Sequence, residues 1–283
     1  MSSILVAGCG FVGNELARRL CADRQEVWGL RRNISALPPG VHPVCADLRA
    51  PSTLEALPTE LDAIVYTAAP DESSDTSYKE IYVDALSRLL ERAASISRPP
   101  TRLVLVSSTG VYGQNDGAAV NESSLTEPTR FSGRRLLESE QIAAQSGMTT
   151  TVIRFGGIYG PGRTALIERV KAGTALLTNA PSYTNRIHRD DCAGAIAHIL
   201  TLSAPPPTII GVDENPADRN DVVKWMAQRL GVPTKVDDTS VSTASGKRCS
   251  AALLRSTGYE FTYPSYREGY PAIIDAYLSA VTR

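Results

Sequence analysis

The chain has 283 residues and a formal net charge of −1, with 29 Lys and Arg against 30 Asp and Glu. This balance argues against a global basic field for nucleic acid or an anionic membrane. Its five cysteines are scattered and include no CxxC pair, so neither a disulfide framework nor a metal site is expected. No apolar run approaches the ~18 residues of a membrane span, and no signal-type stretch is seen. We therefore expect a cytoplasmic protein with no nucleic-acid or membrane partner.

The first apolar run leads directly into a glycine turn. Residues 4–8 predict a buried strand, residues 8–13 read GCGFVG, and residues 13–22 predict a helix. In such a GxGxxG turn the first glycine allows the tight bend, the second allows a pyrophosphate to approach, and the third lets the helix pack on the strand. The alternative is a turn that serves packing alone. The residues predicted to bind the pyrophosphate of a dinucleotide are Gly8, Gly10, Phe11, Val12 and Gly13.

A pair of arginines ends the second predicted strand, residues 26–30. Arg31 stands eighteen positions after Gly13, where an acidic residue would hold the ribose 2′-hydroxyl of NAD. No carboxylate is present there, and Arg31 and Arg32 suit a 2′-phosphate, which guanidinium groups bind with charge-assisted, bidentate hydrogen bonds. The sequence therefore predicts NADP(H) as cofactor, with a solvated arginine pair as the alternative.

Strands and helices alternate along the rest of the first half. The further predicted strands are 43–45, 62–67, 102–107, 150–155 and 207–212, and the longer predicted helices are 76–95, 132–146 and 190–202. Alternation of this kind predicts an α/β fold with a doubly wound parallel sheet, the Rossmann fold. Beyond Gly156 the pattern loosens, with shorter helices near 164–172, 218–230 and 268–280. We expect an NADP-binding Rossmann domain over 1–155 and a smaller, substrate-facing C-terminal region over 156–283, from which 186–212 returns to the core.

Several segments, in order, resemble the extended branch of the short-chain dehydrogenase/reductase superfamily, the NAD-dependent epimerase/dehydratases. Besides the glycine turn they are Ala46-Asp47-Leu48, Thr67-Ala68-Ala69, the VSSTGVYG of 106–113, the RFGGIYGPG of 154–162 and the IHRDD of 187–191. The resemblance implies that Asp47 and Leu48 lie at the adenine and that Thr67, Ala68 and Ala69 lie along the cofactor. It also implies that Ser108 faces the nicotinamide and contacts a substrate carbonyl or hydroxyl.

The catalytic pair of that family is altered here. The family carries Tyr-x-x-x-Lys on the helix after the fifth strand, within a Tyr-Gly-Arg-Ser-Lys-Leu-x-x-Glu pattern. Aligned without a gap, the pattern places Ser132 at the tyrosine and Leu136 at the lysine. A shift of one residue would place Phe131 and Arg135 there instead, at the expense of the other matches. Serine cannot be tuned to exchange a proton near pH 7 as a tyrosine beside a lysine can.

The candidate catalytic residues are therefore Ser108, Ser132 and Tyr112. Tyr159 and His188 are further candidates for a replacement proton donor. For both tyrosines the alternative is packing of their loops, and for His188 it is packing or capping beside Asp190.

The sequence leaves the ligand open. Relatives that act on nucleotide sugars often place an arginine seven positions before the residue that matches Asp191, and Thr184 stands there. Arg186, Arg189 and Arg163 lie nearby and allow recognition of an anionic substrate by displaced residues. Lys247-Arg248, a further basic pair, enters the C-terminal helical segment, where it either approaches the cleft from the other side or is a solvated start of a helix.

We predict an atypical NADP(H)-dependent reductase or epimerase-like enzyme that acts on a small carbonyl, hydroxyl or sugar-type substrate. One alternative is a non-catalytic protein that senses NADP(H) or binds a partner. Another is an empty cleft in which the glycine turn is only structural. The resemblance also implies a homodimer formed through helices 76–95 and 132–146.

Overall fold

The computed structural model describes residues 1–237, 239 and 243–281, and the chain divides into two compact units. Unit 1 consists of Met1–Tyr112, Thr126–Arg154 and Cys192–Ile209, and unit 2 of Gly113–Leu125, Phe155–Asp191 and Ile210–Arg283. The first unit therefore extends almost to the expected boundary at residue 155. Two details differ from the expected ranges, because residues 113–125 belong to unit 2 and the segment that returns to the Rossmann core is 192–209.

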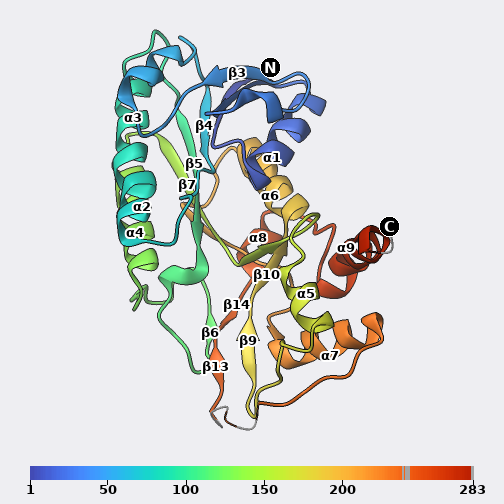
Figure 1. Ribbon diagram of the computed structural model, residues 1–283. Helices are drawn as coiled ribbons and strands as arrows, with labels where there is room; N and C mark the ends of the chain where they lie inside the picture. The colour runs from blue at the N-terminus through green and yellow to red at the C-terminus, as the bar shows by residue number, and fades with distance from the viewer. Residues whose placement is uncertain (238, 240–242, 282–283) are drawn as a thin grey trace. The chain divides into compact units, whose positions relative to one another are not determined.

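A seven-stranded parallel sheet has the strand order β11-β7-β5-β4-β1-β2-β3 (Figure 1). Its strands are β1 (Ser3–Ala7), β2 (Glu26–Arg31), β3 (His42–Cys45), β4 (Ala63–Tyr66), β5 (Arg102–Ser108), β7 (Thr149–Phe155) and β11 (Thr208–Gly211). All seven appear within two residues of the ranges expected from the sequence. The order reverses at β1, which pairs with β2 on one side and β4 on the other. The prediction of a doubly wound parallel sheet is confirmed.

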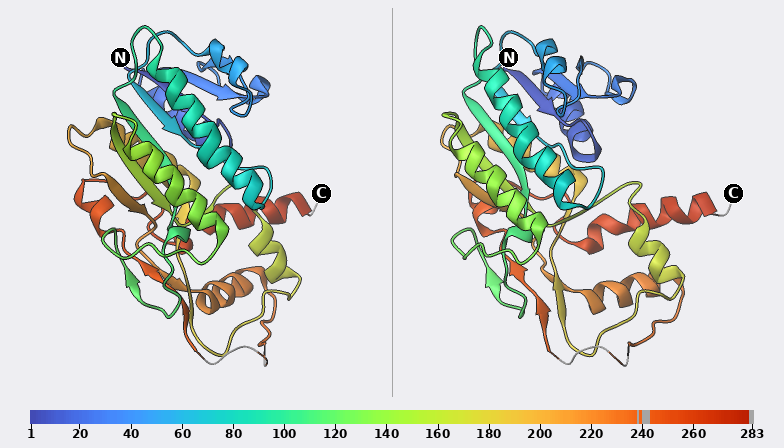
Figure 2. Two further views of the ribbon diagram at one scale, coloured as in Figure 1. Left: turned by 90° about the vertical axis from the view of Figure 1, so that its left-hand side faces the viewer. Right: turned by 60° about the vertical axis from the view of Figure 1, so that its left-hand side comes forward.

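Helices cover both faces of this sheet. On one face lie α1 (Phe11–Ala22) and α6 (Arg189–Thr201), and on the other α2 (Asp75–Tyr78), α3 (Leu86–Ala94) and α4 (Phe131–Ala144). Figure 2 shows α3 and α4 side by side. Every residue of β1 and β4 is buried, as expected of strands between two helical layers. Short 3₁₀ turns complete unit 1: η1 (Ile34–Ala36), η2 (Pro51–Ala56) and η4 (Thr109–Val111).

The predicted helix over 76–95 is not a continuous α-helix. A π-helix, η3 (Lys79–Ala85), separates α2 from α3. The buried Tyr66, at the end of β4, donates its hydroxyl to the carbonyl of Ile81 at 2.5 Å. Turns of this width are rare in helices and usually have a specific cause. Hydrophobic periodicity could not reveal this one, because the tyrosine hydroxyl comes from a distant strand.

Unit 2 contains short strands and four helices within its described residues. They are β6 (Ala119–Val120), β8 (Gly157–Tyr159), β9 (Ser182–Thr184), β10 (Arg186–His188), β12 (Ala217–Asp218), β13 (Ser245–Gly246), β14 (Arg248–Cys249), α5 (Ala165–Lys171), α7 (Arg219–Leu230), α8 (Ala252–Ser256) and α9 (Tyr266–Val281). Strand β8 pairs with β10, and β9 pairs with both β12 and β13. Buried side chains of α5, α7 and α9 share one hydrophobic cluster.

The expected helix start at Lys247-Arg248 is wrong. Arg248 instead begins β14, which pairs in parallel with β6, and its Nε donates to the carbonyl of Gly117 at 2.8 Å. The next helix, α8, begins at Ala252. A two-residue strand of this kind is specified by its distant partner and leaves no periodic signal.

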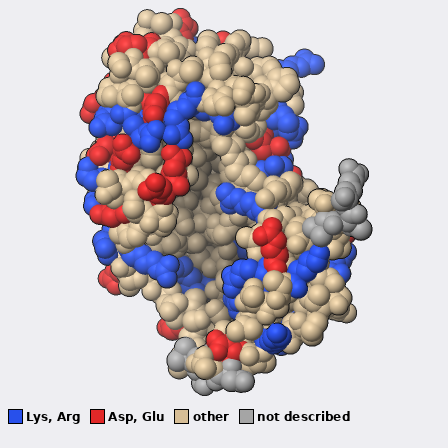
Figure 3. All heavy atoms as spheres, in the orientation of Figure 1, with Lys and Arg blue, Asp and Glu red and all other residues tan. Residues whose placement is uncertain are grey.

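Charges of both signs share the surface. On the face shown in Figure 3, Lys and Arg side chains lie among Asp and Glu side chains. This mixture agrees with the near-neutral net charge and leaves recognition of a charged ligand to local clusters.

Candidate functional site

Two glycines of the turn after β1 are required by the fold itself. Gly8 has φ +99°, and a Cβ built on it would lie 2.4 Å from the backbone nitrogen of Ala68. A Cβ on Gly13 would lie 2.5 Å from the carbonyl oxygen of Gly8. The first position therefore needs glycine for both its backbone angle and its space, and the second for close packing of α1 on the turn.

Gly10 differs from both. A Cβ on Gly10 would meet only the carbonyl oxygen of Gly8, at 3.9 Å, which is ordinary van der Waals contact. Gly10 is also the N-cap of α1, which has no side-chain cap and no acidic residue in its first turn. The N-terminal end of a helix carries partial positive charge and suits an anion. Lack of space therefore does not explain this glycine, and an open backbone at this point suits a ligand that approaches it closely.

The loop after β4 is joined to the same turn. Thr67 donates its hydroxyl to the carbonyl of Gly8 at 2.8 Å and its backbone N–H to Ala7 at 2.8 Å. Ala68 and the exposed Ala69 follow at once. These residues lie where the strand order reverses, which is where open α/β sheets bind ligands. The structure thus brings Thr67 and Ala68 to the glycine turn.

The two arginines after β2 differ in their partners. The side chain of Arg31, at the end of the strand, makes no hydrogen bond or ion pair with any described residue, while its carbonyl accepts the N–H of Ala46. The Nη2 of Arg32 lies 3.0 Å from Oδ1 of Asp71, and both side chains are more than half exposed. Arg31 is thus available to an anionic ligand, whereas Arg32 already holds a carboxylate.

Asp47 and Leu48 follow β3. Both oxygens of Asp47 are bound by Arg49, through Nε at 3.0 Å and Nη2 at 2.8 Å. Hydrogen bonding from Arg49 lowers the pKa of Asp47 to about 2, so this carboxylate is ionised. The side chain of Leu48 lies in the hydrophobic core, so that only its backbone can contact a ligand.

The two candidate catalytic serines lie on neighbouring segments. Ser108 ends β5, and its Oγ accepts the N–H of Gly110 at 3.0 Å. Ser132 is in the first turn of α4. A Cβ on Gly133 would lie 2.6 Å from the carbonyl oxygen of Gly110, so α4 begins in contact with the loop that starts at Ser108. The glycine that matched the family pattern is thus explained by packing.

Helix α4 supplies no replacement for the missing lysine. Leu136 is buried in its place, with 5% of its surface exposed. Arg134 donates to the carbonyl of Thr129 at 3.0 Å. Arg135 donates to both carboxylate oxygens of Asp75, from Nε at 2.8 Å and from Nη2 at 2.9 Å. The shifted alignment therefore fails to restore a cation, because Arg135 is held by an acidic residue of α2.

Tyr112 belongs to a buried polar network. Its hydroxyl accepts a hydrogen bond from Nη1 of Arg154 at 2.7 Å, and the same guanidinium binds both oxygens of Glu140. Ser107 donates its hydroxyl to Glu140 at 2.6 Å. Only 2% of Tyr112 is exposed. The contacts favour packing of the loop over proton transfer for this tyrosine.

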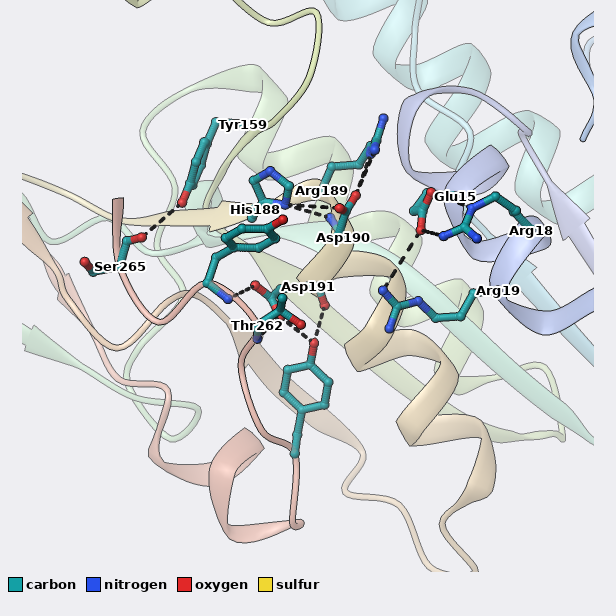
Figure 4. Close-up of polar contacts among 12 residues, drawn as sticks. Glu15, Arg18, Arg19, Tyr159, His188, Arg189, Asp190, Asp191, Thr262 and Ser265 are labelled. Carbon is teal, nitrogen blue, oxygen red and sulfur yellow. Dashed lines mark hydrogen bonds and ion pairs between the residues drawn. The ribbon is translucent and has the colours of Figure 1, made fainter. Parts of the chain in front are cut away.

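Tyr159 and His188 also serve packing. Tyr159 donates its hydroxyl to the carbonyl of Ser265 at 3.3 Å, and burial raises its pKa above the ordinary value. The Nδ1 of His188 accepts the N–H of Asp190 at 3.2 Å (Figure 4). The centroid of the His188 ring lies 3.9 Å from that of the Tyr263 ring. The expectation that His188 caps or packs beside Asp190 is confirmed.

The fully buried Asp191 has a role that the sequence did not reveal. Its carboxylate accepts the hydroxyl of Tyr259 at 2.8 Å and the N–H groups of Thr262 and Tyr263 at 2.8 and 2.9 Å. In Figure 4 Asp191 lies beside Thr262, and dashed lines mark hydrogen bonds of its carboxylate. Asp191 therefore anchors a segment about seventy residues later, and only the structure could pair the two.

Three arginines of unit 2, Arg169, Arg186 and Arg219, lie close enough for the first two to affect the pKa of the third. Arg186, of which 8% is exposed, donates to Oγ1 of Thr184 at 2.7 Å, and Arg219 donates to the carbonyl of Leu176 at 2.6 Å. Burial lowers the pKa of Arg219, and the charges of Arg169 and Arg186 lower it further. Among the described residues none of these arginines forms an ion pair. Arg186 had been noted from the sequence, whereas Arg169 and Arg219 had not.

Asp213 is a second buried acid of unit 2 that the sequence did not reveal. Its Oδ1 accepts the N–H of Asn215 at 3.2 Å, while Oδ2 is buried without a partner. Burial raises the pKa of Asp213 to about 7. The charge of this side chain is therefore expected to change near neutral pH.

No described helix combines the length and hydropathy needed to cross a bilayer. Within the described part of the chain, no three His, Cys, Asp or Glu side chains gather as metal ligands.

Comparison with known proteins gives consistent results. A curated relative, dTDP-6-deoxy-L-talose 4-dehydrogenase (NAD(P)(+)) from Kitasatospora kifunensis, is 27% identical over 266 residues, which cover 86% of this chain and 83% of the relative. A solved structure of a candidate NAD-dependent epimerase/dehydratase from Methylobacillus flagellatus is 35% identical, with a TM-score of 0.84 over 98% of this chain and 99% of that one.

Two more distant structures show the same fold. MoeE5 in complex with UDP-glucose and NAD is 21% identical with a TM-score of 0.80, over 99% of both chains. The human epimerase family protein SDR39U1 with NADPH is 21% identical with a TM-score of 0.78, over 96% of this chain and 99% of that one. The sequence pattern of the NAD dependent epimerase/dehydratase family matches residues 4–212. The chain therefore belongs to the NAD-dependent epimerase/dehydratase family, within the extended short-chain dehydrogenase/reductase superfamily.

Proposed function

We propose that this protein binds NADP(H) at the glycine turn and uses it on an anionic, sugar-type substrate that carries a carbonyl or hydroxyl group. The space beside Gly10 carries the proposal. Close packing requires glycine at Gly8 and Gly13 but not at Gly10, where a Cβ would occupy open space beside the N-terminal end of α1. A pyrophosphate needs this close approach to the backbone.

The arginines after β2 support NADP(H) over NAD. Arg31 carries a charge that no described residue pairs, and no carboxylate stands at positions 29–33 to hold a ribose 2′-hydroxyl. Relatives use either form, since MoeE5 was solved with NAD and human SDR39U1 with NADPH. The preference of this chain therefore depends on its own residues at the end of β2.

The bound cofactor would supply or accept a hydride. Ser108 and Ser132 lie on adjoining segments and can donate hydrogen bonds to a carbonyl or hydroxyl group. Loss of a positioned general acid lowers a rate by about 10²–10⁴ and leaves proximity and orientation intact. We therefore expect slow turnover, with the proton supplied by a group other than the usual tyrosine.

The arginines of unit 2 support an anionic substrate. Arg186 contacts Thr184, the position where relatives that act on nucleotide sugars often carry arginine. Arg169 and Arg219 add charge nearby. UDP-glucose is bound by MoeE5, and the curated relative takes its name from a dTDP-sugar. We propose a nucleotide sugar as the substrate class.

Calorimetric titration of NADPH and NADH tests the cofactor. NADPH should bind more tightly to the wild type, and Arg31→Glu should weaken NADPH at least tenfold while leaving NADH nearly unchanged. Arg24→Glu, at the exposed other end of β2, is the matched control because it changes net charge equally. Equal or tighter binding of NADH, or no binding of either cofactor, would contradict the proposal.

A second candidate function is non-catalytic sensing of NADP(H), which the buried Leu136 and the serine at position 132 favour. NADPH oxidation across a panel of carbonyls and sugar nucleotides separates the two. Turnover that is lost in Ser108→Ala supports the enzyme. Tight binding without turnover, together with a cofactor-dependent change in association state, selects the sensor. Light scattering on the same samples also tests our proposal of a homodimer formed through α2, α3 and α4.

A further inference from the structure

Asp71 forms an ion pair with Arg32, one of the two arginines proposed to bind the 2′-phosphate. It lies on the loop between β4 and α2, where its Oδ1 is 3.0 Å from Nη2 of Arg32. Its Oδ2 is 3.9 Å from Nη1 of Arg49. The side chain of Asp71 is 59% exposed and that of Arg32 is 54% exposed. The contact is therefore an exposed ion pair, which a stronger anion can displace.

Arg49 is committed to another acid. Its Nε and Nη2 bind both oxygens of Asp47, and this pairing raises the pKa of Arg49 above its ordinary value. Asp71 therefore depends mainly on Arg32 for a close partner. A ligand that bound Arg32 would break the ion pair of 3.0 Å between Arg32 and Asp71. Among the described residues, Asp71 would then keep only the longer contact of 3.9 Å with Arg49.

The Asp71 carboxylate and a 2′-phosphate would compete for the Arg32 guanidinium, and their charges decide which of them binds. Two guanidinium groups, of Arg32 and Arg49, bind two carboxylates, of Asp47 and Asp71, and Arg31 adds a further positive charge at the end of β2. A 2′-phosphate carries more negative charge than a carboxylate and accepts bidentate hydrogen bonds from arginine. With Asp71 still at Arg32, the phosphate would meet a like charge at the same guanidinium.

We infer that Asp71 sets the preference between phosphorylated and unphosphorylated adenosine, because its carboxylate occupies the Arg32 guanidinium that a 2′-phosphate requires. The inference rests on the proposed NADP(H) site. Asp71 lowers the affinity for the 2′-phosphate, whereas an unphosphorylated ribose carries no anion that competes for Arg32, so the protein distinguishes the two cofactors less than its arginines alone would allow.

Two fragments of the cofactor test this without turnover. 2′,5′-ADP carries the 2′-phosphate and 5′-AMP lacks it, and neither contains the nicotinamide end. Asp71→Asn should bind 2′,5′-ADP about two- to fivefold more tightly than wild type, the range expected when an exposed ion pair no longer competes. Binding of 5′-AMP should stay the same. The gain should shrink in high salt, because exposed charges are then screened.

The neighbouring acid provides a matched control. Glu72→Gln removes the same charge one residue away, from an exposed side chain that has no ion pair within the described chain. An equal gain in Asp71→Asn and Glu72→Gln, or weaker binding of 2′,5′-ADP by Asp71→Asn, overturns the inference and leaves the NADP(H) site standing. If the wild type and Asp71→Asn both bind 2′,5′-ADP no better than 5′-AMP, the 2′-phosphate site itself fails, and the inference with it.

Discussion

Arg154 on β7 and Glu140 on α4 form a two-point ion pair inside unit 1, with Nη2 2.6 Å from Oε2 and Nε 3.0 Å from Oε1. Both side chains are at least nine-tenths buried. The pair ties α4, the helix that carries Ser132, to the central sheet. Glu140 matched the family pattern in the sequence, and its contact with Arg154 explains the match by position rather than by catalysis.

Removal of one partner of this pair should destabilise the protein strongly. Glu140→Ala leaves the guanidinium of Arg154 buried without its counter-charge, and we expect the free energy of unfolding to fall by about 3–5 kcal/mol. Glu138→Ala, two residues away, breaks a more exposed pair with Arg135 and should cost less than about 1 kcal/mol. Urea unfolding of both variants measures the difference, and equal losses would show that the Arg154 pair is not special.

Substitution of Gly10 should separate ligand binding from folding. In Gly10→Ala the new methyl group meets no protein atom closer than 3.9 Å, so the free energy of unfolding should stay the same or rise by up to about 1 kcal/mol. Binding of NADPH should weaken at least tenfold, because the methyl group fills the space proposed for the pyrophosphate. Thermal unfolding and calorimetry check the two parts.

Gly13→Ala is the control for that experiment, because its methyl group would lie 2.5 Å from the carbonyl oxygen of Gly8. This variant should be clearly less stable than the wild type. Unchanged NADPH binding in a stable Gly10→Ala protein would mean that the open space beside Gly10 is not used by the cofactor.

Stability should depend on pH through Asp213. Its pKa is raised by burial to about 7 in the folded protein, above the ordinary 3.8 expected when unfolded. The folded state therefore favours the protonated form, so the stabilisation is complete below about pH 4 and is lost as the pH rises through 7. For Asp213→Asn, which stays neutral, the free energy of unfolding relative to wild type should increase between pH 5 and pH 8. Urea unfolding at both values tests this, and a pH-independent difference would contradict it.

Removal of Arg219 should reduce anion binding without harm to the fold. Arg219→Gln retains a donor for the carbonyl of Leu176 and removes repulsion from Arg169 and Arg186. We expect unchanged or slightly higher thermal stability and at least fivefold weaker binding of UDP, used as the probe. NADPH binding should not change. If UDP binds equally to both proteins, the three arginines do not form the substrate's anion site.

The sheet and its glycine turn could be predicted from the sequence because their signals are local. Each strand is a short apolar run, and Gly8 and Gly13 stand at fixed spacing between a strand and a helix. The structure adds the contact of Thr67 with Gly8, which lie at the carboxyl ends of two neighbouring parallel strands. The strands and the glycine turn depend on chain order and short spacing, so the sequence was enough to predict them.

Contacts between residues far apart in the sequence could not be predicted. Asp71 gave no signal as a partner of Arg32, because thirty-nine positions separate them and either residue alone reads as a solvated charge. Asp191 and Asp213 are buried acids whose surroundings come from separate segments. Arg169 and Arg219 lie on different helices, and no periodicity relates them. These roles depend on tertiary packing, which local patterns do not encode.

The π-helix between α2 and α3 has a consequence for the register of that segment. A regular α-helix advances about 100° per residue, so one additional residue in a turn rotates everything before it relative to everything after it. This offset allows Tyr78 to meet the ring of Phe131, at 5.4 Å, while Leu86 and Leu89 point into the sheet. Deletion of a single residue within Lys79–Ala85 would keep the segment helical but turn the aromatic side chain away from α4, so this stretch tolerates substitution better than a change in length.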